Sequence, residues 1–194
     1  MVTCLDDAIG GLLDTLDELG LAKRTLVVFF SDNGGGGVGD NGALRGGKGQ
    51  MFEGGVRVPF IARWPGMLPA GLVKNEFLST LELFPTLAAV AETAVPQGVK
   101  LDGFDMMPVL RGEAGSNRNE MFWERRNDRA ARVGSYKWVD SAKGQGLFDL
   151  STDLAERHDL SAERPEVLRR LQGRFDAWKA EMEAAEPRGP FRDY

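Results

Sequence analysis

Residues 25–66 read TLVVFFSDNGGGGVGDNGALRGGKGQMFEGGVRVPFIARWPG, and they hold most of what the sequence says about function. Residues 26–30 form an unbroken apolar run, which is typical of a parallel strand covered on both faces. The run ends on SDNG at residues 31–34, so polar oxygen donors follow the strand directly. A long glycine-rich loop then leads to a second predicted strand, residues 56–64, in which Pro59 favours an edge or bulge position.

The flanking sequence alternates between helical and strand patterns. Apolar residues at three- and four-residue spacing predict helices over residues 5–19, 77–91 and 165–183. A shift to Gly, Glu, Ser and Asn over residues 111–119 predicts a boundary, with residues 1–112 as one domain and residues 113–194 as a small α+β unit. The small unit has four short strand candidates, at residues 120–124, 131–133, 136–139 and 147–149, with a hairpin turn at Gly134-Ser135.

Composition excludes several classes of protein. The chain has 194 residues and a formal net charge of -5, which argues against nucleic acid as a partner. No run of 18 apolar residues occurs, so we expect no membrane span. The single Cys4 and the single His158 exclude an internal disulfide and a His-rich zinc site. The first residues do not resemble a signal peptide, and the compartment stays open; a signal peptide on a longer protein would make it periplasmic or secreted.

Asp32 and Asn33 are candidate metal ligands. A carboxylate and an amide oxygen at the carboxyl end of a buried strand lie where open α/β sheets bind ligands. Calcium and magnesium both prefer oxygen donors of this kind. The residues alone leave a second interpretation open, in which Asp-Asn-Gly only turns the chain.

Two glycine patterns in the loop resemble nucleotide-binding motifs, and both are incomplete. Residues 37–42 fit G-x-G-x-x-G, but the following residues do not read as a helix. Residues 42–48 fit G-x-x-x-x-G-K, but Gly49 stands where a Ser or Thr is needed. Lys48 still lies between glycines, which would let its ammonium approach an anion closely. The alternative for Lys48 is an exposed lysine in a mobile loop.

The pieces SDNGG, NGALRGGKG and EGGVRVPFIARWPG occur in one order and closely resemble the sulfatase family of the alkaline phosphatase-like superfamily. LELFPTLAAVA resembles the family's D-x-x-P-T helix, with Glu82 where an aspartate is usual. DGFDMMPVLRGE resembles its D-G-x-S-x-x-P-x-L segment, with Asp105 in place of the serine. LFDLSTDLAERHDL resembles the C-terminal strand and turn of the family. The resemblance implies an α/β fold: the C-terminal part of an alkaline phosphatase-like sandwich, with a small antiparallel sheet plus a helix.

The resemblance also implies a reaction and its residues. Sulfatases hydrolyse sulfate esters with a formylglycine nucleophile made from the cysteine of C-x-P-x-R. Their calcium ion is held by two N-terminal aspartates and by the aspartate and asparagine of S-D-N-G, which Asp32 and Asn33 match. Lys48 matches the lysine that contacts a sulfate oxygen and is the expected catalytic residue. The implied cofactor is calcium, with magnesium as the alternative.

The departures from the family are as informative. No C-x-P-x-R motif occurs here, since Cys4 is followed by Leu5-Asp6-Asp7-Ala8, and the early aspartate pair has no counterpart. We therefore interpret the chain as a sulfatase fragment that is inactive alone and whose partners are a sulfate ester and the missing N-terminal half of the fold. The alternatives are a phosphodiesterase or phosphonate hydrolase of the same superfamily, or a non-catalytic interaction domain.

Overall fold

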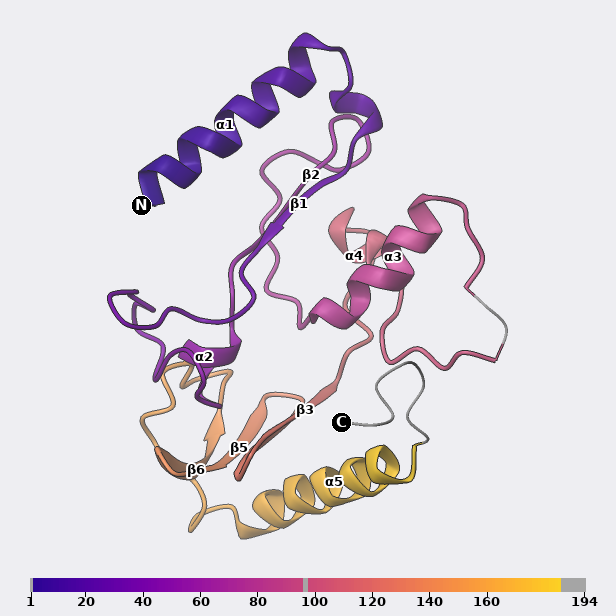
Figure 1. Cartoon of the computed structure of the whole chain (residues 1–194). Coiled ribbons are helices and arrows are strands. Elements are labelled where there is room, and N and C mark those ends of the chain that lie inside the picture. Colours follow the sequence, from indigo (N-terminus) through magenta and orange to yellow (C-terminus); the bar gives the residue numbers. More distant parts are fainter. Residues whose placement is uncertain (1, 96–97, 186–194) are drawn as a thin grey trace, which may run out of the picture. The chain divides into compact units, whose positions relative to one another are not determined.

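The computed structural model describes residues 2–95 and 98–185, and its chain divides into two compact units (Figure 1). The first unit joins Met1–Phe30 to Pro59–Arg118, and the second joins Ser31–Val58 to Asn119–Tyr194. The compact units are defined by contacts within this chain and do not test the predicted domains 1–112 and 113–194, which stay a prediction. Within the described ranges, no helix is both long and apolar enough to span a membrane.

The first unit begins with α1 (Val2–Glu18) and the 3-10 turn η1 (Ala22–Arg24), followed by β1 (Val27–Phe30) and β2 (Phe60–Arg63). The two strands pair antiparallel, with Val27 opposite Arg63 and Phe30 opposite Phe60. The prediction of a parallel strand covered on both faces therefore differs from this structure, in which β1 is only partly buried and pairs with β2 alone among the described strands.

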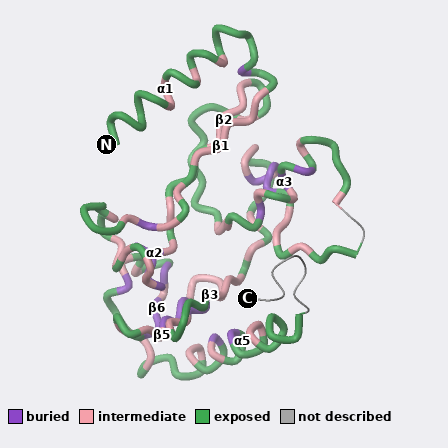
Figure 2. Tube along the Cα trace, viewed as in Figure 1, coloured by how far each residue is buried: buried purple, intermediate pink, exposed green. Residues whose placement is uncertain are grey.

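Helix α1 of the first unit is largely exposed. Figure 2 draws this helix without any buried position, and none of its residues is classed as buried. Its apolar stripe is present as predicted, yet Leu5, Leu12 and Leu19 are 51%, 55% and 65% exposed. An amphipathic helix is stable in water mainly when its apolar stripe is packed, so this stripe is a surface that the described residues do not cover.

The rest of the first unit is η2 (Thr80–Glu82), α3 (Leu83–Val90) and α4 (Met107–Leu110). Ser79 begins this helical segment with a capping box, in which its side chain accepts from Leu81 N and Glu82 accepts from Ser79 N. The carboxylate of the buried Glu82 also pairs with the guanidinium of Arg118. Glu82, which stands where the family motif usually has an aspartate, therefore has partners for its charge. Asp105 accepts a hydrogen bond from Met107 N at 2.9 Å and thereby starts α4.

The second unit is built on a four-stranded antiparallel sheet in the order β3-β4-β5-β6. The strands are Glu120–Arg125, Asp128–Val133, Tyr136–Ser141 and Gly144–Asp149. Two-residue turns join them, and the predicted hairpin at Gly134-Ser135 is confirmed by the pairing of Val133 with Tyr136. Gly134 has a φ of 61°, which a glycine adopts without the steric cost of a side chain.

The two faces of this sheet carry separate apolar clusters because successive residues of a strand point to opposite faces. One face packs Ala131, Trp138 and Leu147 against Leu171 and Phe175 of the C-terminal helix α5 (Pro165–Ala184). The other face packs Ala130, Val139, Phe148 and Leu150, from the sheet and its border, against Met51 and Phe52 at the end of the glycine-rich loop. The glycine-rich loop therefore lies on the sheet face opposite α5.

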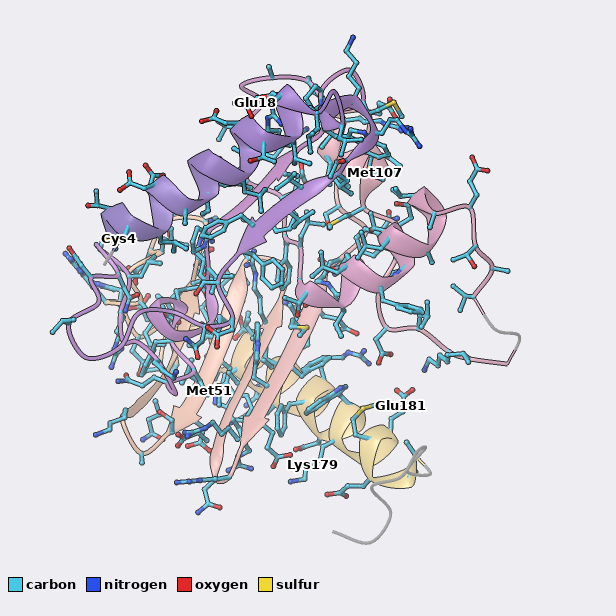
Figure 3. The ribbon with its side chains drawn as sticks, turned by 45° about the horizontal axis from the view of Figure 1, so that its top comes forward. Cys4, Glu18, Met51, Met107, Lys179 and Glu181 are labelled. Atoms are coloured by element: carbon cyan, nitrogen blue, oxygen red, sulfur yellow. The ribbon has the colours of Figure 1, made fainter. Side chains whose placement is uncertain are left out.

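Helix α5 confirms the predicted C-terminal helix and its buried side. Its Phe175 ring lies 5.6 Å from the Trp138 ring, edge to face. On its outer side, Lys179, labelled in Figure 3, places Nζ 2.6 Å from Glu124 Oε1 of β3. The small antiparallel sheet with a C-terminal helix is thus present as expected. The tail after Ala185, which the sequence predicts to be loose, lies outside the described residues.

Candidate functional site

The SDNG turn opens the second unit directly after β1. Ser31 Oγ donates to the carbonyl of Asn33 at 2.7 Å, and Asn33 Nδ2 donates to the carbonyl of Gly34 at 3.2 Å. Gly34 N then donates to the carbonyl of Gly55 at 3.0 Å, which joins the start of the loop to its end. Asp32 is exposed at the tip of this turn, so its carboxylate is open to a ligand.

The glycine-rich loop is held closed by one asparagine. Asn41 Oδ1 accepts from Gly35 N at 2.7 Å, while Asn41 Nδ2 donates to the carbonyls of Gly35 and Gly46, each at 3.0 Å. One side chain thus links three points of the loop that are apart in sequence. The two nucleotide motifs find no structural support, because no helix opens at residues 37–48 and the next helix, α2, spans Glu53–Val56.

Lys48 lies beside the SDNG turn in space. Its backbone N donates to the carbonyl of Gly35 at 3.0 Å, two residues beyond Asn33. Its aliphatic stem passes over Gly36, where an added Cβ would lie 2.8 Å from Lys48 Cβ. A residue larger than glycine at position 36 would therefore displace the lysine stem. The hydrogen bond to Gly35 thus places the Lys48 backbone next to the SDNG turn that contains Asp32 and Asn33, and the Lys48 side chain is exposed.

The same loop is too tightly packed for side chains at its contact points. A Cβ on Gly34 would lie 1.7 Å from the carbonyl oxygen of Gly54, and one on Gly55 would lie 2.1 Å from the carbonyl oxygen of Gln50. Both contacts are with backbone, which has little room to move. The glycines are therefore required by close backbone approach, and the loop is an ordered structure.

The donor set for a metal is partial. Among the described residues, no three His, Cys, Asp or Glu side chains lie close enough to hold an ion. Asp32 and Asn33 have the oxygen donors that calcium prefers, but calcium takes 6–8 ligands. The residues of this chain therefore fit a share of a calcium site and cannot complete one.

Two arginines, Arg45 and Arg57, brace the loop. Arg57 Nη1 lies 3.5 Å from Glu53 Oε2, so this arginine pairs with the carboxylate at the start of α2. Arg45 uses other partners: its Nη1 donates to the carbonyl of Glu156 at 2.9 Å, and its guanidinium lies 3.9 Å from the centre of the Phe52 ring.

A buried charged cluster of Glu53, Lys137 and Glu156 underlies the loop. Lys137 Nζ donates to Glu53 Oε1 at 2.8 Å and lies 3.0 Å from Glu156 Oε1. Glu156 Oε2 accepts from the backbone N of Glu53 at 2.6 Å. All three side chains are almost fully buried, at 3%, 0% and 0% exposure for Glu53, Lys137 and Glu156.

The two carboxyls of this cluster differ in pKa. Burial favours the neutral form of Glu53, but the nearby charges of Lys137, Arg132 and Arg57 outweigh it and lower the pKa of this carboxyl. Burial raises the pKa of Glu156, and the charge of Lys137 offsets that rise only in part. Glu53 therefore loses its proton more readily than Glu156 does.

Sequence reasoning missed Asn41, Lys137 and Glu156. Lys137 had a detectable signal: it stands one position before Trp138 and two before Val139 in a strand, so it shares a core-facing side with Val139. A lysine on that face requires a buried acidic partner. Glu156 gave no local signal, because its role depends on a contact 103 residues away.

Several other residues of the second unit have structural roles. The backbone N of the exposed His158 donates to Asp153 Oδ2 at 2.8 Å. Trp123 packs against one apolar cluster of the sheet, and Trp138 belongs to the other. Arg125 Nη1 donates to the carbonyl of Gly49, directly after Lys48, at 3.2 Å.

Comparisons with known proteins point to one family. The family described as Sulfatase matches residues 1–93. Human arylsulfatase A is 37% identical over 224 residues, covering 96% of this chain and 44% of that protein. Mouse steryl-sulfatase is 43% identical over 161 residues, covering 78% of this chain and 25% of that protein.

Solved structures give the same result. The crystal structure of Ps i-CgsB in complex with k-i-k-neocarrahexaose matches with a TM-score of 0.83 and 32% identity, covering 92% of this chain and 41% of that one. The PsFucS1 sulfatase from Pseudoalteromonas sp. matches with a TM-score of 0.76 and 27% identity, covering 92% and 41%. The chain thus spans less than half the length of these relatives. With nearly all of its own length matched in sequence and in fold, the chain belongs to the sulfatase family.

Proposed function

We propose that this chain supplies one side of a sulfatase active site. Asp32 and Asn33 contribute a carboxylate and an amide oxygen to a calcium site, and Lys48 contacts an oxygen of the sulfate group. The observation that carries the proposal is the hydrogen bond from Lys48 N to the carbonyl of Gly35, which holds the lysine beside the SDNG turn.

The chemistry follows from the charges of these residues. Calcium, when bound, polarises the S–O bonds of the sulfate group. Asn33 Nδ2 is engaged by the Gly34 carbonyl, which orients the amide and leaves Oδ1 as its donor atom toward a cation. The ammonium of Lys48 offsets negative charge that develops on a sulfate oxygen in the transition state. Its aliphatic stem passes close to Gly36, so the absence of a side chain at position 36 leaves room for the lysine.

The remaining ligands and the nucleophile come from the N-terminal half of the same fold. Two observations support this part of the proposal. The chain covers only 44% of human arylsulfatase A. The first unit also leaves large apolar side chains exposed that a complete fold would bury. Among them are Leu12, Ile61 and Phe84, which are 55%, 61% and 57% exposed. We therefore assign to the isolated chain no hydrolysis of sulfate esters.

An assay of the purified 194-residue chain with 4-nitrophenyl sulfate and calcium tests this proposal. We expect no sustained release of 4-nitrophenol, because the chain lacks a C-x-P-x-R motif. Sustained turnover that is lost on Lys48→Ala and kept on Lys143→Ala would show that the chain is complete and would overturn the fragment interpretation. Reading the DNA upstream of codon 1 gives an independent test, since the proposal expects an in-frame C-x-P-x-R or S-x-P-x-R motif there.

A further inference from the structure

We infer that Glu156 is a positioning residue for Lys48, which fastens both flanks of the lysine loop to the C-terminal turn of the second unit. This inference rests on the proposed contact of Lys48 with sulfate. It assigns to the small C-terminal sheet and its border a part in placing the catalytic charge.

The flank before Lys48 is held by the backbone of Glu156. Arg45, three residues ahead of the lysine, donates from Nη1 to the carbonyl of Glu156 at 2.9 Å. The guanidinium is fixed from its other side by the Phe52 ring, whose centre is 3.9 Å away. Arg45 also presents its own carbonyl to Gly54 N at 2.7 Å, so its position sets that of the loop backbone.

The flank after Lys48 is held by the side chain of Glu156. Its Oε2 accepts from the backbone N of Glu53, five residues beyond the lysine, at 2.6 Å. Its Oε1 lies 3.0 Å from Lys137 Nζ, which in turn donates to Glu53 Oε1 at 2.8 Å. The backbone of Glu53 is therefore tied to Glu156 of the turn, and its side chain is tied to Lys137 of the sheet.

The backbone conformation of Glu156 supports a specific role. Its φ is 52°, in the left-handed region that non-glycine residues seldom adopt and that persists where the surroundings enforce it. The turn is stabilised by Asp153 Oδ2, which accepts from Arg157 N and His158 N at 2.8 Å each. In this conformation the carbonyl and the carboxylate of one residue both reach the loop. A glycine would adopt the same backbone more easily but could not supply the carboxylate.

Amide hydrogen exchange on the full 194-residue chain tests the inference. The two reporters are Lys48 N, bonded to the Gly35 carbonyl, and Gly54 N, bonded to the Arg45 carbonyl. In Glu156→Ala we expect both amides to exchange at least about tenfold faster, while the amides of β4 and β5 change by less than about twofold. The matched control is Glu163→Ala, an exposed glutamate near the same turn, which should leave all of these amides unchanged.

The conservative variant Glu156→Gln separates positioning from charge. Its side-chain oxygen still accepts from Glu53 N, so we expect it to restore most of the protection of Lys48 and Gly54 that Glu156→Ala loses. Unchanged exchange at Lys48 in Glu156→Ala would overturn the inference. Equal loss of protection across β4 and β5 in both variants would also overturn it, because Glu156 would then be a general stability residue.

The readout involves neither sulfate nor metal. A result that Lys48 makes no contribution to sulfate hydrolysis would therefore remove the proposed function and leave the exchange result intact. Conversely, a catalytic Lys48 whose amide is indifferent to Glu156 would remove the inference alone.

Discussion

Replacing Lys137 by methionine is the sharpest perturbation of the structure. The substitution keeps most of the side-chain volume and removes the only fully buried ammonium among the described residues. It leaves Glu53 and Glu156 facing each other at a site where both side chains are at most 3% exposed. Two cations still act on Glu53: Arg132, whose charge lowers the pKa of this carboxyl, and Arg57, whose Nη1 is 3.5 Å from Glu53 Oε2.

The expected loss of stability follows from the burial of these groups. Removing one partner of a buried ion pair costs about 3–5 kcal/mol, because the remaining charge has lost both water and its partner. A domain of ordinary stability unfolds with about 5–15 kcal/mol, so the variant is expected to keep only part of its folding free energy. The double variant Lys137→Met with Glu156→Gln should recover part of the loss, since it neutralises the carboxyl that is least compensated.

Urea unfolding followed by tryptophan fluorescence measures this loss. Three of the four tryptophans, Trp123, Trp138 and Trp178, lie in the second unit, so the signal reports mainly on the unit that contains the cluster. The control Lys143→Met, at an exposed turn position, should stay within about 0.5 kcal/mol of the wild type. A loss below about 1 kcal/mol for Lys137→Met would refute the reasoning, because it would mean that the ammonium is not desolvated.

Three further perturbations have defined outcomes. Burial raises the pKa of Glu156 above its ordinary 4.5, so the stability from this carboxyl is complete below that pH and is lost as the pH rises through the raised folded-state pKa. Urea unfolding from about pH 4 to about pH 8 should therefore show a smaller decline in Glu156→Gln than in the wild type, and an identical decline would contradict it. Gly34→Ala, whose Cβ would lie 1.7 Å from the Gly54 carbonyl oxygen, should speed tryptic cleavage after Arg45 and Lys48, whereas Gly10→Ala, with nothing within 4 Å, should not. Phe175→Ala should cost about 3–5 kcal/mol of unfolding free energy by chemical denaturation, against less than about 0.5 kcal/mol for the exposed Phe84→Ala.

Local signals predicted most of the second unit. The short strand candidates on either side of the Gly134-Ser135 turn identified the β4–β5 hairpin, and the spacing of Leu171, Phe175 and Trp178 identified the buried side of α5. These features depend on neighbours a few residues apart, so periodicity and turn chemistry are sufficient to find them.

Contacts between residues far apart in the chain could not be predicted from the sequence. The pairing of β1 with β2 depends on a partner 30 or more residues away, and an apolar run alone cannot distinguish a parallel from an antiparallel strand. The cluster of Glu53, Lys137 and Glu156 joins three segments, and all three of its members are common surface residue types. The roles of Asp32, Asn33 and Lys48 stay a proposal that rests on family motifs, because their residue types alone are equally compatible with a turn and an exposed lysine.

The most direct test joins this chain to the N-terminal part of human arylsulfatase A that precedes the matched region, in cells that convert the nucleophile cysteine to formylglycine. The folded, modified protein should hydrolyse 4-nitrophenyl sulfate. Removal of a single charge-stabilising donor typically costs about 100- to 1,000-fold in turnover, so Lys48→Ala should lower kcat by about that factor while Lys143→Ala leaves it unchanged. A folded and modified protein that has no activity, or one whose kcat is unchanged by Lys48→Ala, would contradict the proposal that this chain supplies the sulfate-contacting side of a sulfatase.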